Sequence, residues 1–249
     1  MDFRCTKRCF SFDTFGSTLI RPGVLTRSIR SRLNESGEET RRITGIGCPT
    51  EIILAVDFIS SQRQANLVSE VGDPEPHIQS LFATLRTIQN FDIHRWVDSV
   101  TCVDGEAHAI LPDDLVHIGT IWKLAAEIYA TSLLYNLTED PSLLLPLVDV
   151  MRGEYDLLGP SHYLFYGLVW PTFVAGASST RPEQRVWALG MLETIWSGAL
   201  CGNAKNATLV LEQLWEKQDL ARGRSGTGEL AEWDWISELS SLEDRWIFL

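Results

Sequence analysis

A closely spaced pair of cysteines, Cys5-Thr-Lys-Arg-Cys9, lies near the start of this 249-residue chain. Thiolates at this spacing are compatible with zinc, which a structural site holds with four ligands. No second cysteine pair and no histidine pair lies nearby in the sequence. Two unliganded thiols are therefore the interpretation we favour, and the sequence predicts no metal site.

Adjacent carboxylates at Asp113 and Asp114 are a second group that could do chemistry, because such pairs on a helix can hold magnesium against a diphosphate. They follow Pro112, however, where the start of a helix needs an acidic cap, so capping is the favoured interpretation. The histidines are scattered, and none forms the i, i+4 pair with an intervening glutamate that a helical zinc protease requires. They are His77, His94, His108, His117 and His162.

Two glycine-rich stretches, Gly45-Ile-Gly47 and Gly226-Thr-Gly228, lack the features of a phosphate-binding loop. Neither follows a strand pattern, and neither is followed by the Lys-Ser/Thr that faces a phosphate. The Gly-x-Ser-x-Gly pattern of a nucleophile elbow is also absent from the sequence. We therefore predict no catalytic residue and no cofactor site, and we expect that the protein is not an enzyme.

The net charge of −12 is unevenly distributed along the chain. Residues 1–45 contain nine basic and five acidic residues, whereas the remainder contains twelve basic and twenty-eight acidic residues. An acidic body repels phosphate backbones, so it is a poor surface for duplex DNA. The basic segment 1–45 is rich in Ser, Thr and Gly, which predicts a flexible N-terminal arm. It is either a remnant of a DNA-binding or nuclear-targeting region or a solvated tail.

The five cysteines are odd in number and mostly far apart, and the start of the chain lacks the order of a secretory signal. These features predict free thiols in a reducing compartment. The longest apolar run, from Ile118 to Leu137, is interrupted by Lys123 and Glu127. Both charges would be costly at the centre of a bilayer, so we predict a buried helix and no membrane partner.

From residue 46 onward the apolar residues recur at helical spacing, and no alternating strand pattern of useful length occurs. The fold class predicted is all-α, a single multi-helix domain of largely antiparallel packed helices over residues 46–249. The first expected helix starts at Pro49, the second runs over 78–88, and a third begins at Ile93 after a break near Asn90. The next helices are expected from Asp113 or Asp114 to 137, from 141 to 158 and over 163–177. The last ones are expected from 181 or 182 to 200, over 204–219 and over 229–242, with a loop at 221–228.

Aromatic residues are concentrated in the helical run that contains Leu168-Val-Trp-Pro-Thr-Phe-Val-Ala-Gly176. A proline within an apolar helix removes a backbone donor and usually bends the axis. We hypothesise that a bend lined by aromatic residues opens a pocket or partner surface, whereas plain core packing is the alternative. The candidate residues are Trp170, Pro171, Phe173, Gly176, Arg185 and Trp187.

The order of several segments resembles the fungal-specific transcription factor domain, the helical region that follows a zinc binuclear cluster in many fungal regulators. The matching pieces are Gly47-Cys-Pro-Thr-Glu-Ile-Ile-Leu54, Ala126-Glu-Ile-Tyr-Ala-Thr-Ser-Leu-Leu-Tyr135, the Trp-Pro segment 168–176 with Arg185 and Trp187, Val210-Leu-Glu-Gln-Leu-Trp215 with Asp219, Trp235, and the final Phe248-Leu249. Each piece is weak alone, but their shared order makes the resemblance specific.

The resemblance implies a nuclear regulatory domain that acts by ligand sensing, dimerisation or control of activation. The implied partners are a second copy or transcriptional co-regulators, with a small-molecule effector. The family's DNA-reading module needs six cysteines, and this chain offers only Cys5 and Cys9 in that region. DNA contact is therefore expected only indirectly or through a missing zinc cluster. The alternatives are a helical enzyme acting on an apolar small molecule in fungal metabolism, and a scaffold that heterodimerises with full-length regulators.

Overall fold

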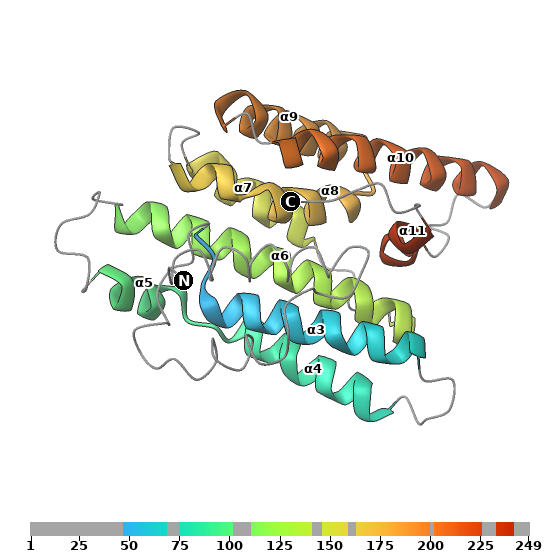
Figure 1. The fold of residues 1–249 in the computed structure, drawn as a ribbon, viewed down its shortest axis with the longest axis horizontal. Helices are drawn as coiled ribbons and strands as arrows, with labels where there is room; N and C mark the ends of the chain where they lie inside the picture. Colours follow the sequence, from blue (N-terminus) through green and yellow to red (C-terminus); the bar gives the residue numbers. More distant parts are fainter. Residues whose placement is uncertain are drawn as a thin grey trace, which may run out of the picture.

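The longest described helix, α6 (Pro112–Thr138), forms the centre of the molecule in a computed structural model (Figure 1). The structure describes residues 47–68, 75–101, 111–140, 146–158, 163–199, 202–225 and 233–241. The other elements are α3 (Thr50–Val68), α4 (Glu75–Gln89), α5 (Ile93–Thr101), α7 (Leu147–Leu157), the 3-10 helix η3 (Tyr163–Gly167), α8 (Val169–Ala177), α9 (Pro182–Ala199), α10 (Gly202–Ser225) and α11 (Trp235–Ser241). No strand occurs among the described residues, so the all-α, single-domain prediction is confirmed.

Helix α6 is buried along most of its length because other helices cover both of its sides. Helices α3, α4 and α5 pack against one side, and α7 and α8 pack against the other. Lys123, one of the two charges that interrupt its apolar run, donates a hydrogen bond to the carbonyl of Phe91 (3.0 Å). The other, Glu127, accepts one from Gln89 of α4 (2.8 Å). No helix of the described residues is long and apolar enough to cross a membrane.

The start of α6 differs from the prediction. We expected Asp113 or Asp114 to cap this helix, but it begins at Pro112, with Leu111 in extended geometry before it and no side-chain cap. Proline has no backbone N–H to leave unpaired, and its fixed φ suits the first helical position. The two carboxylates therefore lie inside the first turn, near the positive end of the helix dipole.

Helices α3 and α4 lie below α6 in Figure 1. They confirm the helices that the apolar spacing predicted for this part of the sequence. Helix α3 begins at Thr50, one residue after Pro49, and buries Ile52 and Val56. In α4 the predicted stripe is confirmed, because Leu81, Leu85 and Ile88 are all buried. Stripes at this spacing point to one side of a helix, which here is the side that faces α6.

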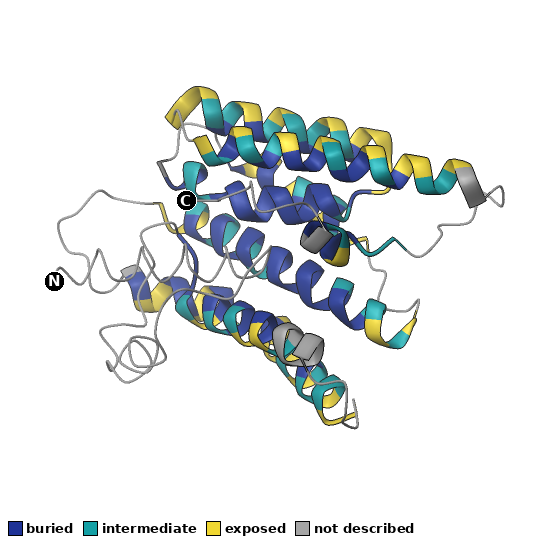
Figure 2. Ribbon diagram, turned by 45° about the vertical axis from the view of Figure 1, so that its right-hand side comes forward, coloured by how far each residue is buried: buried dark blue, intermediate teal, exposed yellow. Residues whose placement is uncertain are grey.

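Helices α8, α9 and α10 form the second half of the molecule and contact one another pairwise. Every residue of α8 is buried between α6 on one side and the α9–α10 pair on the other. Helices α9 and α10 are the outermost layer, and Figure 2 shows that their exposed residues face away from the core. They run antiparallel, because Arg185 contacts Asp219 near one end and Trp196 contacts Lys205 near the other.

The expected helix over 163–177 is divided in the structure, so Pro171 does not lie in a helix interior. Residues 163–167 form η3, and α8 begins only at Val169. Pro171 is thus in the first turn of α8, where backbone N–H groups have no intrahelical partner. The first hydrogen bond of the helix is donated by the next residue, Thr172, to the carbonyl of Leu168 (3.0 Å). The proline therefore costs α8 no hydrogen bond.

Helix α10 also runs further than the sequence predicted. Residues 221–225, expected to open a loop over 221–228, continue the helix to Ser225. Arg222 in this added turn pairs with Asp219 (4.0 Å) and donates a hydrogen bond to the carbonyl of Thr180 (3.4 Å). The hydrogen bond to Thr180 is a tertiary contact, and contacts of this kind override the weak helix preference of a Gly-containing stretch. The arm 1–45, with Cys5 and Cys9, lies outside the described residues, as do the expected helix starts at Pro141 and Glu229.

Candidate functional site

The six predicted site residues fall into two groups in the structure. Trp170, Pro171, Phe173 and Gly176 are on α8 and are buried. Arg185 and Trp187 are on α9 and are half-buried. The first group packs into the core, and the second lies where α9 meets α10 and α7.

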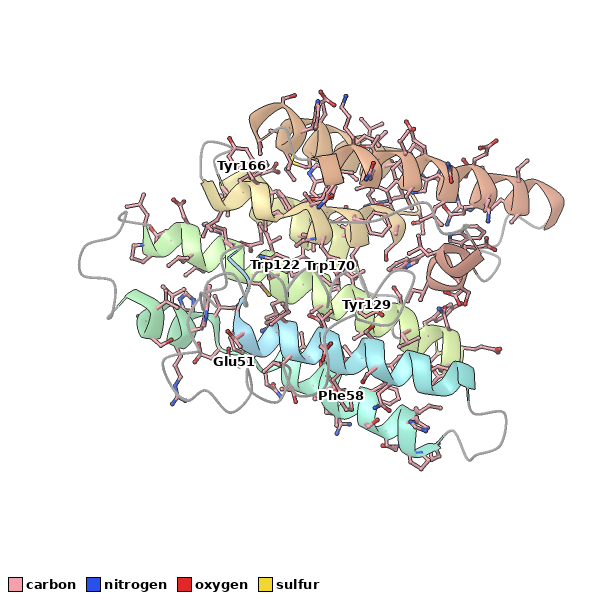
Figure 3. The ribbon with its side chains drawn as sticks, viewed as in Figure 1. Glu51, Phe58, Trp122, Tyr129, Tyr166 and Trp170 are labelled. Atoms are coloured by element: carbon pink, nitrogen blue, oxygen red, sulfur yellow. The ribbon has the colours of Figure 1, made fainter. Side chains whose placement is uncertain are left out.

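The indole of Trp170 stacks on that of Trp122 from α6, with ring centroids 5.8 Å apart and an interplanar angle of 11° (Figure 3). The ring of Tyr129 meets Trp170 edge-on at 6.2 Å. Phe173 meets Trp235 of α11 in the same edge-on manner at 6.4 Å. Stacked and edge-to-face pairs contribute beyond the burial of apolar area. These aromatic contacts tie α6, α8 and α11 together.

Gly176 is the point at which α8 lies closest to the outer helices. A Cβ at this position would lie 2.7 Å from Cδ1 of Leu211 and 3.2 Å from Cβ of Ala188. The carbonyl of Gly176 accepts a hydrogen bond from the indole N–H of Trp215 on α10 (3.1 Å). The missing side chain therefore permits both the close packing and the hydrogen bond between the two helices.

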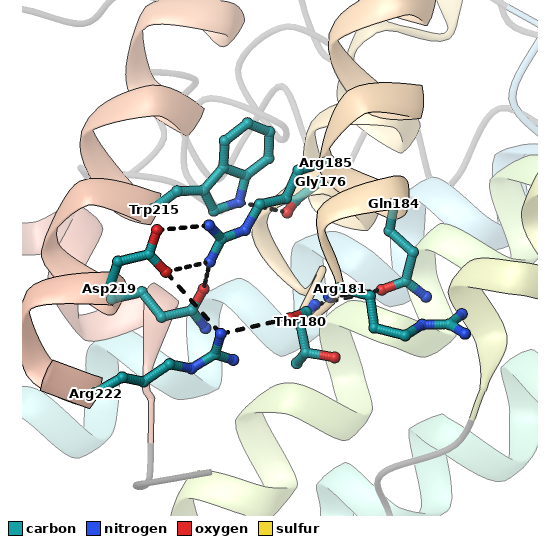
Figure 4. A network of polar contacts seen from close by, with 9 residues as sticks. Gly176, Thr180, Arg181, Gln184, Arg185, Trp215, Asp219 and Arg222 are labelled. Atoms are coloured by element: carbon teal, nitrogen blue, oxygen red, sulfur yellow. Dashed lines mark hydrogen bonds and ion pairs between the residues drawn. The ribbon is translucent and has the colours of Figure 1, made fainter. Parts of the chain in front are cut away.

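Arg185 joins α9 to α10 through a two-pronged ion pair with Asp219 (Figure 4). Its Nη1 donates to Oδ2 of Asp219 (2.8 Å), and its Nη2 donates to Oδ1 (2.9 Å). Nη2 also donates to Oε1 of Gln218 (2.5 Å), and the guanidinium lies over the ring of Trp215 at 5.4 Å. A planar fork on a carboxylate is the geometry that arginine supplies and lysine cannot.

The electrostatics of this ion pair follow from its geometry. Hydrogen bonding to Arg185 is the largest cause that lowers the pKa of Asp219; partial burial opposes it, and the charges of Arg185 and Arg222 add to it. The Asp219 side chain is 56% exposed, whereas that of Arg185 is only 15% exposed. The carboxylate is therefore ionised at neutral pH and balances a cation that is largely removed from water.

A second polar junction joins the start of α9 to α7. Asp149 of α7 forms an ion pair with Arg181 and accepts a hydrogen bond from Nε2 of Gln184 (3.2 Å). The other end of the Gln184 amide, Oε1, accepts the backbone N–H groups of Thr180 (3.3 Å) and Arg181 (3.4 Å), as Figure 4 shows. A glutamine that reaches back from the third helical position is half of a capping box. Gln184 thus both caps α9 and fixes it to α7.

Trp187 lies between α9 and α7. Its ring meets the edge of Tyr155 at 5.3 Å, and the guanidinium of Arg152 lies 6.0 Å from its centroid. The hydroxyl of Tyr155 is hydrogen-bonded to that of Thr172 (2.8 Å), and burial raises the pKa of this phenol. The indole nitrogen of Trp187 is buried and has no hydrogen-bond partner among the described residues.

The prediction missed most of the partners of these residues. Trp215, Gln218 and Asp219 meet Arg185 at i, i+3 and i+4, the spacing that places side chains on one side of a helix. That spacing is visible in the sequence, but only the fold shows that this side faces Arg185. Nothing in the sequence signals the pairing of Asp149 with Arg181 across 32 residues.

The other residues considered for chemistry are dispersed. His117 of α6 contacts Glu154 of α7 (2.8 Å), and His77 contacts Gln62 (2.9 Å). The thiol of Cys48 is fully buried, and burial, with the nearby charge of Glu51, raises its pKa. Within the part of the chain that the structure describes, no three His, Cys, Asp or Glu side chains are placed to share a metal ion.

Comparison with known protein families matches the sequence to the fungal specific transcription factor domain over residues 5–249. The chain belongs to this family. The resemblance inferred from the order of the segments is thereby confirmed, and membership supports a role in the regulation of transcription. The two junctions that hold α9 are therefore features of a fungal transcription factor domain.

A relative of this fungal transcription factor domain is the acriflavine sensitivity control protein acr-2 of Neurospora crassa. The two sequences are 26% identical over 208 residues, which cover 78% of this chain and 32% of the relative. The chain therefore spans about a third of the length of this curated relative. No solved structure matches the domain.

Proposed function

We propose that this domain regulates a fungal transcription factor by binding protein partners in the nucleus, without a catalytic step of its own. The observation that carries the proposal is the fixed position of the α9–α10 pair. Arg185 joins the two helices to each other, and Trp215 joins α10 to α8. An interaction surface binds best when it is held in its bound conformation beforehand, because less ordering entropy is lost.

The acidity of the chain also favours protein partners over direct DNA binding. The residues after position 45 contain twenty-eight acidic and twelve basic residues, which repel a phosphate backbone. The five cysteines of the sequence are one fewer than a six-cysteine cluster needs. We therefore propose that this polypeptide contacts DNA only through another module. A mobility-shift titration in which the chain alone binds one duplex tightly and sequence-specifically would contradict this.

A small-molecule effector is a second proposal, and the specific observation behind it is Trp187. Its buried indole N–H, unpartnered among the described residues, is a donor that a ligand acceptor could satisfy at the α7–α9 junction. Tyr155 and Arg152 supply an aromatic edge and a cation next to it. Removing the indole N–H with W187F should weaken any effector that uses it; an effector that raises the melting temperature equally in both proteins does not bind there.

The regulatory role itself is tested by fusing residues 1–249 to an unrelated DNA-binding module in a fungal reporter strain. We expect the fusion to change reporter expression relative to the module alone. A variant with the junction broken, R185A, should lose this effect at equal protein level, whereas R86A on the exposed side of α4 should retain it. A fusion that behaves like the module alone, although folded and nuclear, would overturn the proposal.

A further inference from the structure

The outer sides of α9 and α10 carry large apolar side chains that remain about half exposed or more. Val186 on α9 is 70% exposed, and Leu209 and Leu220 on α10 are 46% and 56% exposed. The opposite side of α10 buries Val210, Leu211, Leu214 and Trp215 in the core. Single exposed apolar residues are common on protein surfaces, so these three do not by themselves indicate a binding surface. The residues next to them along α10 decide whether one is present.

Acidic residues lie between Leu209 and Leu220 along α10. Glu212 and Glu216 are exposed on α10, and Glu193 is exposed on the adjacent α9. None of the three forms an ion pair with a described residue. Like charges one turn apart on a helix are mutually destabilising by a few tenths of a kcal/mol. Glu212 and Glu216 thus carry a small cost that no described cation offsets.

The spacing along α10 places these residues on one stripe. Leu209, Glu212, Glu216 and Leu220 follow at intervals of three, four and four residues, which keeps them on one side of a helix. The two leucines are about 16 Å apart along the axis. At the ends of this stretch the cations are already engaged: Lys205 lies over Trp196 at 4.4 Å, and Arg185 holds Asp219.

We propose that this acidic–apolar face of α10, defined by Leu209, Glu212, Glu216 and Leu220, binds a basic amphipathic helix of a partner protein. The inference rests on the proposed function, because it names the class of partner that the domain would bind. The partner helix places apolar residues on Leu209 and Leu220 and lysine or arginine residues against Glu212 and Glu216. Electrostatic complementarity of this kind gives specificity and speeds association.

Charge also decides against two other occupants of the same face. Duplex DNA is repelled by the unpaired carboxylates. In a dimer with two-fold symmetry the same face is used by both copies, so the acidic centre would meet a second acidic centre. A helix of opposite charge is therefore the occupant that the face fits.

The binding test uses the purified full chain and two labelled synthetic peptides of about 18 residues, long enough for five helical turns. One peptide has leucines on one face and lysines beside them, and its twin has glutamate at every lysine position. Fluorescence anisotropy should show saturable binding of the basic peptide alone. Binding of both peptides with equal affinity, or of neither, would overturn the proposal.

Charge reversal on α10 separates the proposed face from the general acidity of the chain. We expect E212K/E216K to weaken the basic peptide at least about tenfold, since two attractions become repulsions. The matched control E51K/D156K has the same change in net charge at exposed positions on α3 and α7. Figure 3 places Glu51 on the opposite side of the molecule from α9 and α10. Equal loss of affinity in both variants would show general electrostatics only and overturn the proposal.

A separate variant tests the apolar contribution of Leu209 and Leu220 to peptide binding. L209S/L220S should weaken the basic peptide at high salt, where ionic attraction is screened and apolar contacts persist. Unaltered affinity at high salt would overturn the apolar part of the face. E212K/E216K should keep the wild-type melting temperature, because both side chains are solvent-exposed. E51K/D156K and L209S/L220S should lower it only slightly, since Glu51 is in the first turn of α3 and serine is a weaker helix former than leucine. If peptide binding fails while the reporter fusion still works, this face is wrong and the regulatory role stands.

Discussion

Arg185 of α9 and Asp219 of α10 face each other across the outer layer, joined by two parallel hydrogen bonds of 2.8 and 2.9 Å. The guanidinium also rests on Trp215, whose own N–H reaches the backbone of Gly176 on α8. Arg185 and Trp215 together thus fix the relative positions of three helices. The consequences can be measured on the stability of the whole domain.

Two replacements of Arg185 should weaken the connection between α9 and α10 to different degrees. R185A removes the ion pair, the Gln218 hydrogen bond and the contact with Trp215, and should lower the free energy of unfolding by about 1–2 kcal/mol. R185K keeps the charge but loses the fork, so we expect a smaller loss in the same direction. Urea unfolding measures both, and R86A should lie within about 0.5 kcal/mol of wild type. Equal stability of R185A and wild type would contradict a connecting role.

The ion pair should also give the domain a specific dependence on pH. The folded pKa of Asp219 lies below its ordinary value of 3.8, so its stabilisation is fully present above that value and is lost as pH falls towards the folded pKa. The stability difference between wild type and D219N should therefore be constant near neutrality and shrink below about pH 4. Thermal unfolding of the two proteins across this range measures the gap, which is small because Asp219 is half exposed. A gap that widens on acidification would refute the assignment.

Two glycines in helices offer a matched test of packing. G176A places a methyl 2.7 Å from Leu211 and 3.2 Å from Ala188, and should destabilise the domain by about 1–2 kcal/mol despite the better helix propensity of alanine. At Gly190 of α9 a Cβ would have no atom within 4 Å, so G190A should stabilise by up to about 1 kcal/mol. Melting temperatures should move in opposite directions. A melting temperature raised in both variants would mean that the α8–α10 approach is not tight.

Two tryptophans separate a paired indole N–H from an unpaired one. W215F breaks the 3.1 Å hydrogen bond to Gly176, whereas W187F removes a buried N–H that has no partner among the described residues. Both variants lose the same ring atoms, so W215F should be less stable than W187F by about 1 kcal/mol. Denaturant unfolding of the two variants compares them directly. If W187F is the less stable protein, its N–H has a partner and the effector proposal loses its basis.

The sequence by itself determined the fold class and the family of this protein. Stripes such as Leu81, Leu85 and Ile88 repeat at the helical period, and the uninterrupted backbone hydrogen bonding of a helix is local, so pattern alone predicts it. The order of the Pro49, Tyr129 and Trp-Pro segments was enough to suggest the family. Near Pro171 and at the end of α10, however, the predicted boundaries were wrong. A proline is tolerated in a first turn for a local reason, whereas the glycine near the end of α10 stays helical beside a contact between Arg222 and Thr180 that is distant in sequence.

Only the tertiary structure decided what the candidate residues do. It assigned Trp170 and Phe173 to aromatic stacks and turned Arg185 towards Asp219, 34 residues away. The sequence shows that Trp215, Gln218 and Asp219 share one side of α10, since their spacing follows the helical repeat. Which helix that side faces is set by the packing of α8, α9 and α10 around Gly176. That packing is a balance of many weak long-range contacts, and no local pattern encodes it.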